Sequence, residues 1–193
     1  MEILGKILGS PARVKIMRLF LLNQGESFTN KNIKRRSRVT QDVLRKELKL
    51  LNSIGFIKKR SKNYMFNSAF KYGTEIEDLL VNSDTVDNET ILEIFKKAGK
   101  LKLIIVSGIF IKNKDSRVDL LIVGNKLKKS KIEEGIHKLE AEIGVELVYA
   151  VFDLKEFSYR LNMYDKLLRD IFDFPHEIIF QAKELSTQSL KKV

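Results

Sequence analysis

The stretch TQDVLRKELKLLNSIGFIKKRSKNYMFN, residues 40–67, holds the pattern of a helix followed by a hairpin. Leu44, Leu48 and Leu51 recur at i, i+4 and i+7, which places them on one helix face that packs against a core. Gly55 follows the last periodic residue and is expected to end the helix as its C′ residue. Two strands, over residues 56–60 and 63–67, are then predicted to join through a short turn.

Two further helices are predicted before this stretch. Ser10 and Pro11 suit the N-cap and first position of an apolar helix over residues 12–22. A short, very basic helix is expected over residues 31–36, and Thr40 is expected to cap the helix after it. The apolar residues that we expect to be buried in the first helix are Val14, Ile16, Met17, Leu19, Phe20 and Leu21.

Charge is distributed unevenly along the chain. Residues 1–73 hold 17 Lys and Arg against 4 Asp and Glu, a net charge of +13. Residues 74–193 hold 19 Lys and Arg against 21 Asp and Glu, a net charge of −2. A basic module joined to a near-neutral one is typical of a nucleic-acid binder attached to a second domain. Charge alone does not separate DNA from RNA or from an anionic membrane.

Three helices followed by a basic hairpin resemble the winged helix–turn–helix family of bacterial and archaeal regulators. The residues that carry the resemblance are the apolar helix over 12–22, Val39 and Thr40, Leu48, Leu51, Gly55, Phe56 and Ile57, and the basic run Lys58, Lys59 and Arg60. The resemblance implies a winged helix–turn–helix domain over residues 1–73 that binds double-stranded DNA. Its third helix would be the recognition helix, which lies in the major groove.

The resemblance also implies roles for the polar residues of this domain. Gln41 and Arg45 are the candidates for reading base edges, because Gln can pair with adenine and Arg with guanine. Thr40 precedes them at the start of the recognition helix. Phosphate contacts, which position a protein without reading sequence, are expected from Lys31, Lys34, Arg35, Arg36, Arg38, Lys46 and Lys49. The hairpin cations are expected either to grip a phosphate strand or to probe the minor groove; they are Lys58, Lys59, Arg60 and Lys62. The alternative is a solvated basic face on a winged helix that binds protein.

The second half of the chain has a mixed helix and strand pattern. Residues 74–88 are expected to form a short helix and a linker, and residues 181–193 a polar tail. Helices are predicted over 89–100, 129–143, 154–163 and 164–172, and strands over 101–110, 117–124, 145–153 and 175–180. Most aromatic residues here are expected in the core. The predicted fold class is therefore α+β or α/β, in two domains.

The segments SGIF, residues 107–110, and DSRVDLLIVG, residues 115–124, resemble the small nucleotidyltransferase family, over about residues 89–180. In that family, a Gly-Ser turn precedes Ser-Asp-x-Asp-Leu on the next strand. Its two carboxylates at i and i+2 share one strand face and hold Mg²⁺ together with a third carboxylate from a neighbouring strand. Here Asp119 remains, and Glu146 is the candidate for the third position.

The nucleotidyltransferase pattern is broken at two places. Arg117 stands where the first carboxylate belongs, and the turn reads Ser107–Gly108, in reversed order. Two carboxylates and one Arg cannot build a two-metal site, so we expect a degenerate site with no catalytic residue, metal or cofactor. Two interpretations of Arg117 are open. It replaces the charge of the metal beside Asp119 and Glu146, or it is a surface residue at a strand start.

These patterns together predict a DNA-binding transcriptional regulator that is not an enzyme. Its second domain would sense a ligand, dimerise the protein, or bind a nucleotide or protein partner, and we expect a homodimer. The absence of Cys and of an apolar run of about 20 residues predicts a cytoplasmic protein without a membrane span or a secretion signal. The alternatives are an active nucleotidyltransferase with a nucleic-acid-recruiting domain and a protein-binding scaffold.

Overall fold

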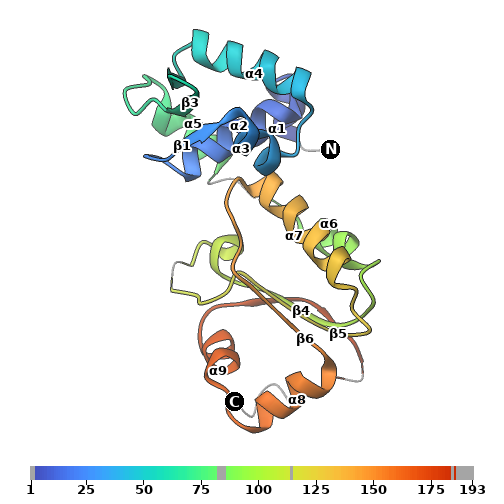
Figure 1. Cartoon of the computed structure of the whole chain (residues 1–193). Helices are drawn as coiled ribbons and strands as arrows, with labels where there is room; N and C mark the ends of the chain where they lie inside the picture. The colour runs from blue at the N-terminus through green and yellow to red at the C-terminus, as the bar shows by residue number, and fades with distance from the viewer. Residues whose placement is uncertain (1–2, 82–85, 114, 184, 186–193) are drawn as a thin grey trace. The chain divides into compact units, whose positions relative to one another are not determined.

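The computed structural model contains both helices and strands, and it describes residues 3–81, 86–113, 115–183 and 185 (Figure 1). The α+β character expected from the sequence is confirmed. Two units are distinguished: unit 1 comprises Met1–Thr85 and His137–Glu146, and unit 2 comprises Val86–Ile136 and Leu147–Val193. Most of the expected polar tail, and residues 82–85 of the expected linker, lie outside the described residues.

Unit 1 combines helices with a small antiparallel sheet. Its elements are α1 (Ile3–Ile7), α2 (Pro11–Leu22), β1 (Ser27–Thr29), α3 (Asn30–Ser37), α4 (Gln41–Ser53), β2 (Ile57–Arg60), β3 (Asn63–Phe66) and α5 (Gly73–Leu80). The strand order is β1-β3-β2. The three helices and two hairpin strands expected before residue 73 are confirmed. Neither α1 nor β1 was predicted, because each is too short to show a periodic pattern.

Local sequence accounts for several ends of these elements. The Ser10 hydroxyl accepts a hydrogen bond from the Arg13 amide at 3.2 Å, so Ser10 caps α2 as expected. Thr40 occupies the N-cap position of α4 without a capping hydrogen bond from its side chain. Gly55 follows α4 with φ of +78°, the left-handed conformation that favours glycine at this position.

The core of unit 1 forms where α2 and α4 meet the sheet. The six apolar residues of α2 that were expected to be buried are all buried, as are Leu44, Leu48 and Leu51 of α4. The Phe20 ring meets Phe28 edge to face at 5.7 Å between centroids, and Phe56 meets Phe66 at 5.3 Å. These contacts anchor α3 and the hairpin to the same core, because Phe28 precedes α3 and Phe66 ends β3.

Unit 1 contains a fully buried arginine, Arg18 of α2. Its Nε donates to the Leu80 carbonyl at 2.7 Å, and its Nη1 donates to the Glu142 carbonyl at 3.0 Å. Leu80 ends α5, and Glu142 lies in the last turn of α7 (Lys129–Ile143). The carbonyls at a helix C-terminus lack intrahelical partners and carry partial negative charge, so they stabilise the buried guanidinium.

Unit 2 is built on a four-stranded mixed sheet. Its elements are α6 (Asn88–Phe95), β4 (Lys100–Val106), the 3₁₀ turn η1 (Gly108–Ile111), β5 (Leu120–Asn125), the first half of α7, β6 (Tyr149–Phe152), α8 (Leu154–Asn162), α9 (Lys166–Asp173) and β7 (Glu177–Gln181). The strand order is β6-β5-β4-β7, with β5 and β6 parallel and the other pairs antiparallel. The predicted elements are present with shifted ends.

The four strands of unit 2 are all shorter than predicted, and three of them differ most. The strand expected over residues 101–110 ends at Val106, and η1 begins two residues later, at Gly108. The other two begin at Leu120 and Tyr149 rather than at 117 and 145. A further expectation was wrong in part: Tyr149, Tyr159, Tyr164 and Phe174 are exposed rather than part of the core. Tyr159 lies on the solvent side of α8, and the other three lie at or beyond the ends of helices and strands, where aromatic residues retain solvent contact.

Helices cover both faces of this sheet (Figure 1). On one face, Phe157 of α8 and Leu168 and Ile171 of α9 pack against Leu103 and Ile105 of β4. The alternate residue Ile104 is also fully buried, because the opposite face is covered as well. There, a Cβ atom on Gly135 would lie 2.6 Å from the ring of Phe95, so a glycine allows α6 and α7 to approach closely.

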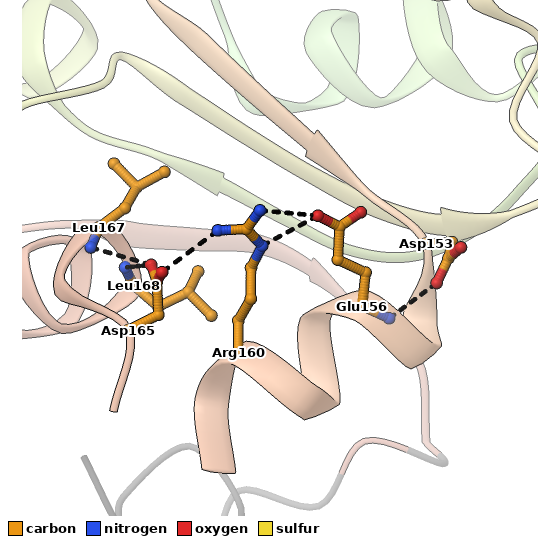
Figure 2. A network of polar contacts seen from close by, with 6 residues as sticks. All are labelled: Asp153, Glu156, Arg160, Asp165, Leu167 and Leu168. Atoms are coloured by element: carbon orange, nitrogen blue, oxygen red, sulfur yellow. Dashed lines mark hydrogen bonds and ion pairs between the residues drawn. The ribbon is translucent and has the colours of Figure 1, made fainter. Parts of the chain in front are cut away.

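Arg160 links α8 to α9 through a network of polar contacts (Figure 2). Its Nε donates to Glu156 Oε1 at 2.9 Å, and its Nη1 donates to Asp165 Oδ2 at 3.2 Å. Asp165 in turn caps α9 by accepting from the Leu167 amide at 3.0 Å. The hydrogen bond to Glu156 raises the pKa of Arg160, and the guanidinium also lies 4.8 Å from the centroid of the Phe152 ring. Arg160 thus joins both helices to β6.

Replacing Arg18 tests how far unit 1 depends on its buried guanidinium. Arg18→Met keeps much of the side-chain volume but leaves the carbonyls of Leu80 and Glu142 without their donor. We therefore expect the free energy of unfolding to fall by about 3 kcal/mol. Lys15→Met is the matched control, because Lys15 also lies on α2 and pairs with Glu142 at 2.6 Å, but it is partly exposed. Lys15→Met is expected to lower the free energy of unfolding by less than about 1 kcal/mol. Urea unfolding of both variants measures the difference, and equal losses would contradict the prediction.

Candidate functional site

A groove of about 360 Å³ runs between α4 and the β2–β3 hairpin of unit 1. Its cationic residues are Arg45 and Lys49 from α4 and Lys59 from β2, and all three are exposed. The remaining lining residues are Asn30, Leu48, Asn52, Ser53 and Tyr64. The groove therefore offers positive charge on both walls, together with amide groups that can donate and accept hydrogen bonds.

The exposed surface of α4 is divided by the helical repeat. Gln41, Arg45, Lys49 and Asn52 recur at i, i+4, i+8 and i+11, so they share one flank, and the groove lining places that flank toward the hairpin. Lys46 is exposed but does not line the groove. The structure thus brings together Arg45 and Lys49 of the predicted recognition set and separates Lys46 from them.

Basic residues of the hairpin also divide between two faces. Lys59 pairs in register with Tyr64, and its Nζ lies 5.8 Å from the centroid of the Tyr64 ring, on the groove side. Lys58 and Arg60 are exposed on the opposite face of the strand, because side chains alternate along it. Lys62 is exposed in the turn between the strands, next to Ser61, which has φ of +54°. The four cations predicted on the hairpin do not form a single patch.

The basic residues of α3 separate in the same way. Asn30, at its start, lines the α4 groove, whereas Lys31 and Lys34 are exposed outside it. Arg36 is turned toward the body of unit 1: its Nη2 donates to Asn23 Oδ1 at 3.2 Å, and its guanidinium lies 5.3 Å from the centroid of the Phe28 ring. Arg36 is thus engaged within unit 1, and the phosphate contact expected of it stays a prediction.

On its other side, α3 borders a cavity of about 390 Å³. The lining residues are Arg35, Arg36, Arg38, His137, Glu140 and Glu146, all of which belong to unit 1. His137 Nδ1 lies 2.8 Å from Glu140 Oε2. The second half of α7 builds one wall, although the sequence predicts this helix within the second domain. The α3 arginines were expected to contact DNA, and Glu146 was expected to belong to the degenerate nucleotidyltransferase site. The structure places them around one cavity, an arrangement that the sequence did not predict.

In unit 2, Asp119 binds backbone groups from two segments. Its Oδ1 accepts from the Ile109 amide at 2.9 Å, and its Oδ2 accepts from the Val148 amide at 2.9 Å. Gly108 has φ of +55°, and a Cβ atom there would lie 2.1 Å from Asp119 Oδ1. Ser107 is buried and donates its hydroxyl to the Val118 carbonyl. Ser107, Gly108 and Asp119 therefore form one hydrogen-bonded turn that joins η1 to the start of β6.

Arg117 is exposed, as the surface interpretation expects, but its partner is not the one that the ion-paired interpretation expects. Its Nε forms an ion pair with Asp170 Oδ2 of α9, and its side chain is half exposed. Asp119 accepts one backbone amide on each carboxylate oxygen, and Glu146 lines the cavity beside α3. The hypothesis of an ion-paired pocket formed by Arg117, Asp119 and Glu146 is thus wrong about the partner of Arg117, which binds a helix that the motif does not include.

The residues of this turn do not fit the magnesium site of the nucleotidyltransferase resemblance. A carboxylate that accepts two backbone hydrogen bonds has both oxygens engaged, and a guanidinium occupies the position of the first ligand. Within the residues described, no group of three or more His, Asp or Glu side chains lies close enough together to hold a metal ion. Nor does any described helix have the length and apolar character needed to cross a membrane.

Comparison with known proteins adds no family: no family model, curated protein or solved structure matches this chain.

Replacing Asp119 tests its structural role. Asp119→Ala leaves the amides of Ile109 and Val148 without their acceptor, so we expect a loss of about 2 kcal/mol in the free energy of unfolding. Asp115→Ala removes an exposed carboxylate of the same loop and is expected to change stability by less than about 0.5 kcal/mol. Thermal unfolding of both variants, with and without Mg²⁺, measures the effect. A Mg²⁺-dependent stabilisation of the unchanged protein that Asp119→Ala abolishes would contradict this role.

Proposed function

We propose that this protein is a DNA-binding transcriptional regulator in which unit 1 is a winged helix–turn–helix domain. The observation that carries the proposal is the groove between α4 and the hairpin, with Arg45 and Lys49 on one wall and Lys59 on the other. A duplex that receives α4 in its major groove would place a phosphate strand between the helix and the hairpin. Cations on both walls suit that strand, and they lie within residues 1–73, which carry a net charge of +13.

The order of elements supports the same proposal. An apolar helix, a short basic helix and an amphipathic third helix are followed by a hairpin, and all pack on one core. Gln41 and Arg45 lie in the first two turns of α4, where side chains of a recognition helix reach base edges. We therefore retain Gln41 and Arg45 for base reading, Lys49 and Lys59 for the phosphate strand, and Lys31, Lys34, Lys46, Lys58, Arg60 and Lys62 as outer contacts.

For unit 2 we propose a nucleotidyltransferase-like domain without catalytic activity. The support is the use of Asp119 as an acceptor for backbone amides and the pairing of Arg117 with Asp170. An active nucleotidyltransferase would need those side chains to bind metal and phosphate instead. The homodimer, the cytoplasmic location and a nucleotide or protein partner at unit 2 stay predictions. The protein-binding scaffold is the rival that the following experiment separates.

Duplex binding measured by fluorescence anisotropy over a salt series tests the proposal. Arg45→Ala with Lys49→Ala removes the two α4 cations of the groove, so we expect the affinity for duplex DNA to fall by about tenfold or more. The slope of the logarithm of the binding constant against the logarithm of salt concentration is expected to fall by about 1–2. Lys46→Ala alone removes an α4 cation outside the groove and is expected to have a smaller effect.

The matched control is Lys96→Ala with Lys97→Ala, two exposed lysines at the end of α6 in unit 2. This pair removes the same charge, and we expect it to leave affinity within about twofold. Absence of binding at low salt by the unchanged chain would overturn the regulator proposal in favour of the scaffold. Equal losses of affinity in the two double variants would mean that binding depends on net charge alone and not on the α4 groove.

A further inference from the structure

The cavity between α3 and the end of α7 has an uncommon lining, since all six of its lining side chains are ionisable. Its volume of about 390 Å³ falls at the small end of the range of roughly 300–1,000 Å³ for ligand pockets. Ligand pockets are lined mainly by apolar side chains with a few placed polar groups, so this ionisable lining favours a charged ligand over an apolar one.

Two of the guanidiniums in this cavity are available to a ligand. Arg35 and Arg38 are exposed and form no hydrogen bond or ion pair within the described residues. The third, Arg36, is held by Asn23 and the Phe28 ring, and so forms a fixed part of the wall. A guanidinium presents a planar fork of N–H donors that matches the oxygens of a carboxylate or a phosphate.

The acidic residues of the cavity are not equivalent. Glu140 is mostly buried and lies against His137 Nδ1 at 2.8 Å, which holds its carboxylate to the α7 wall. Glu146 is exposed and has no ion-pair partner in the part of the chain that the structure describes. Because Glu146 is unpaired, its negative charge opposes an anion in the cavity and weakens its binding.

Arg38 places this cavity next to the turn that connects α3 to α4. Arg38 ends α3 with φ of +53°, and Val39 alone separates it from Thr40, the N-cap of α4. A ligand held by Arg38 would therefore contact the turn that fixes the start of α4.

We propose that this cavity is a binding site for a small oxyanion, a phosphate or carboxylate compound, which Arg35 and Arg38 grip through their guanidinium groups. The site is distinct from the α4 groove, since no residue lines both. It is a property of unit 1 without DNA, so its test does not depend on the proposed function.

Isothermal titration of the full chain with inorganic pyrophosphate and, separately, with citrate tests the proposal and distinguishes the two ligand chemistries. We expect at least one probe to bind with one-to-one stoichiometry. Arg35→Ala with Arg38→Ala is expected to weaken that binding by about tenfold or more. Lys96→Ala with Lys97→Ala, which removes the same charge from two exposed lysines of unit 2, is expected to leave it unchanged.

Two further variants test the chemistry of the site. Arg35→Lys with Arg38→Lys keeps both charges without the guanidinium fork, and it is expected to bind the probe severalfold more weakly than the unchanged chain. Glu146→Gln removes a repulsive charge and is expected to tighten binding. Failure of both probes to bind, equal losses in the two alanine double variants, or unchanged affinity in the lysine variant would each overturn the proposal.

Discussion

The burial of Arg18 is the constraint on which the arrangement of unit 1 depends. Removing a guanidinium from water is costly, so its position is stable only where acceptors surround it. The carbonyls of Leu80 and Glu142 supply that environment at the ends of two helices that are distant in sequence. Gly144, with φ of +99°, completes the fit, because a Cβ atom there would lie 2.7 Å from the Arg18 carbonyl carbon. One side chain thus positions α2, α5 and the end of α7 together.

This anchoring determines which surfaces of α3 face a concavity. With the end of α7 fixed against α2, one side of α3 borders the cavity with His137 and Glu140, and its start borders the groove with Arg45 and Lys49. Arg36, which donates to Asn23 Oδ1 at 3.2 Å, ties α3 to the body of unit 1. A run of basic residues that is uniform in sequence is therefore divided into surfaces with separate chemistry.

In unit 2, a comparable constraint acts through Asp119. Its carboxylate is used to close a turn and to hold the first residues before β6, so a residue type suited to metal binding performs a structural role. The same segment places Arg117 against Asp170, which ties the loop before β5 to α9. Carboxylates satisfied by backbone amides stabilise a fold, whereas catalytic ones need open coordination positions.

The sequence by itself determined the helices and strands whose apolar residues repeat over two or more turns. It also determined the burial of residues such as Leu44 and Phe20, and the basic character of α3, α4 and the hairpin, because periodicity and charge are local properties. Short elements such as α1 and β1 escaped prediction, since their stability comes from packing rather than from their own pattern. Only the tertiary structure decided the partners of Arg18, Arg36, Arg117 and Asp119, and the meeting of Glu146 with the α3 arginines. Those contacts join residues distant in the chain, and their geometry depends on how helices and strands pack, which no local spacing records.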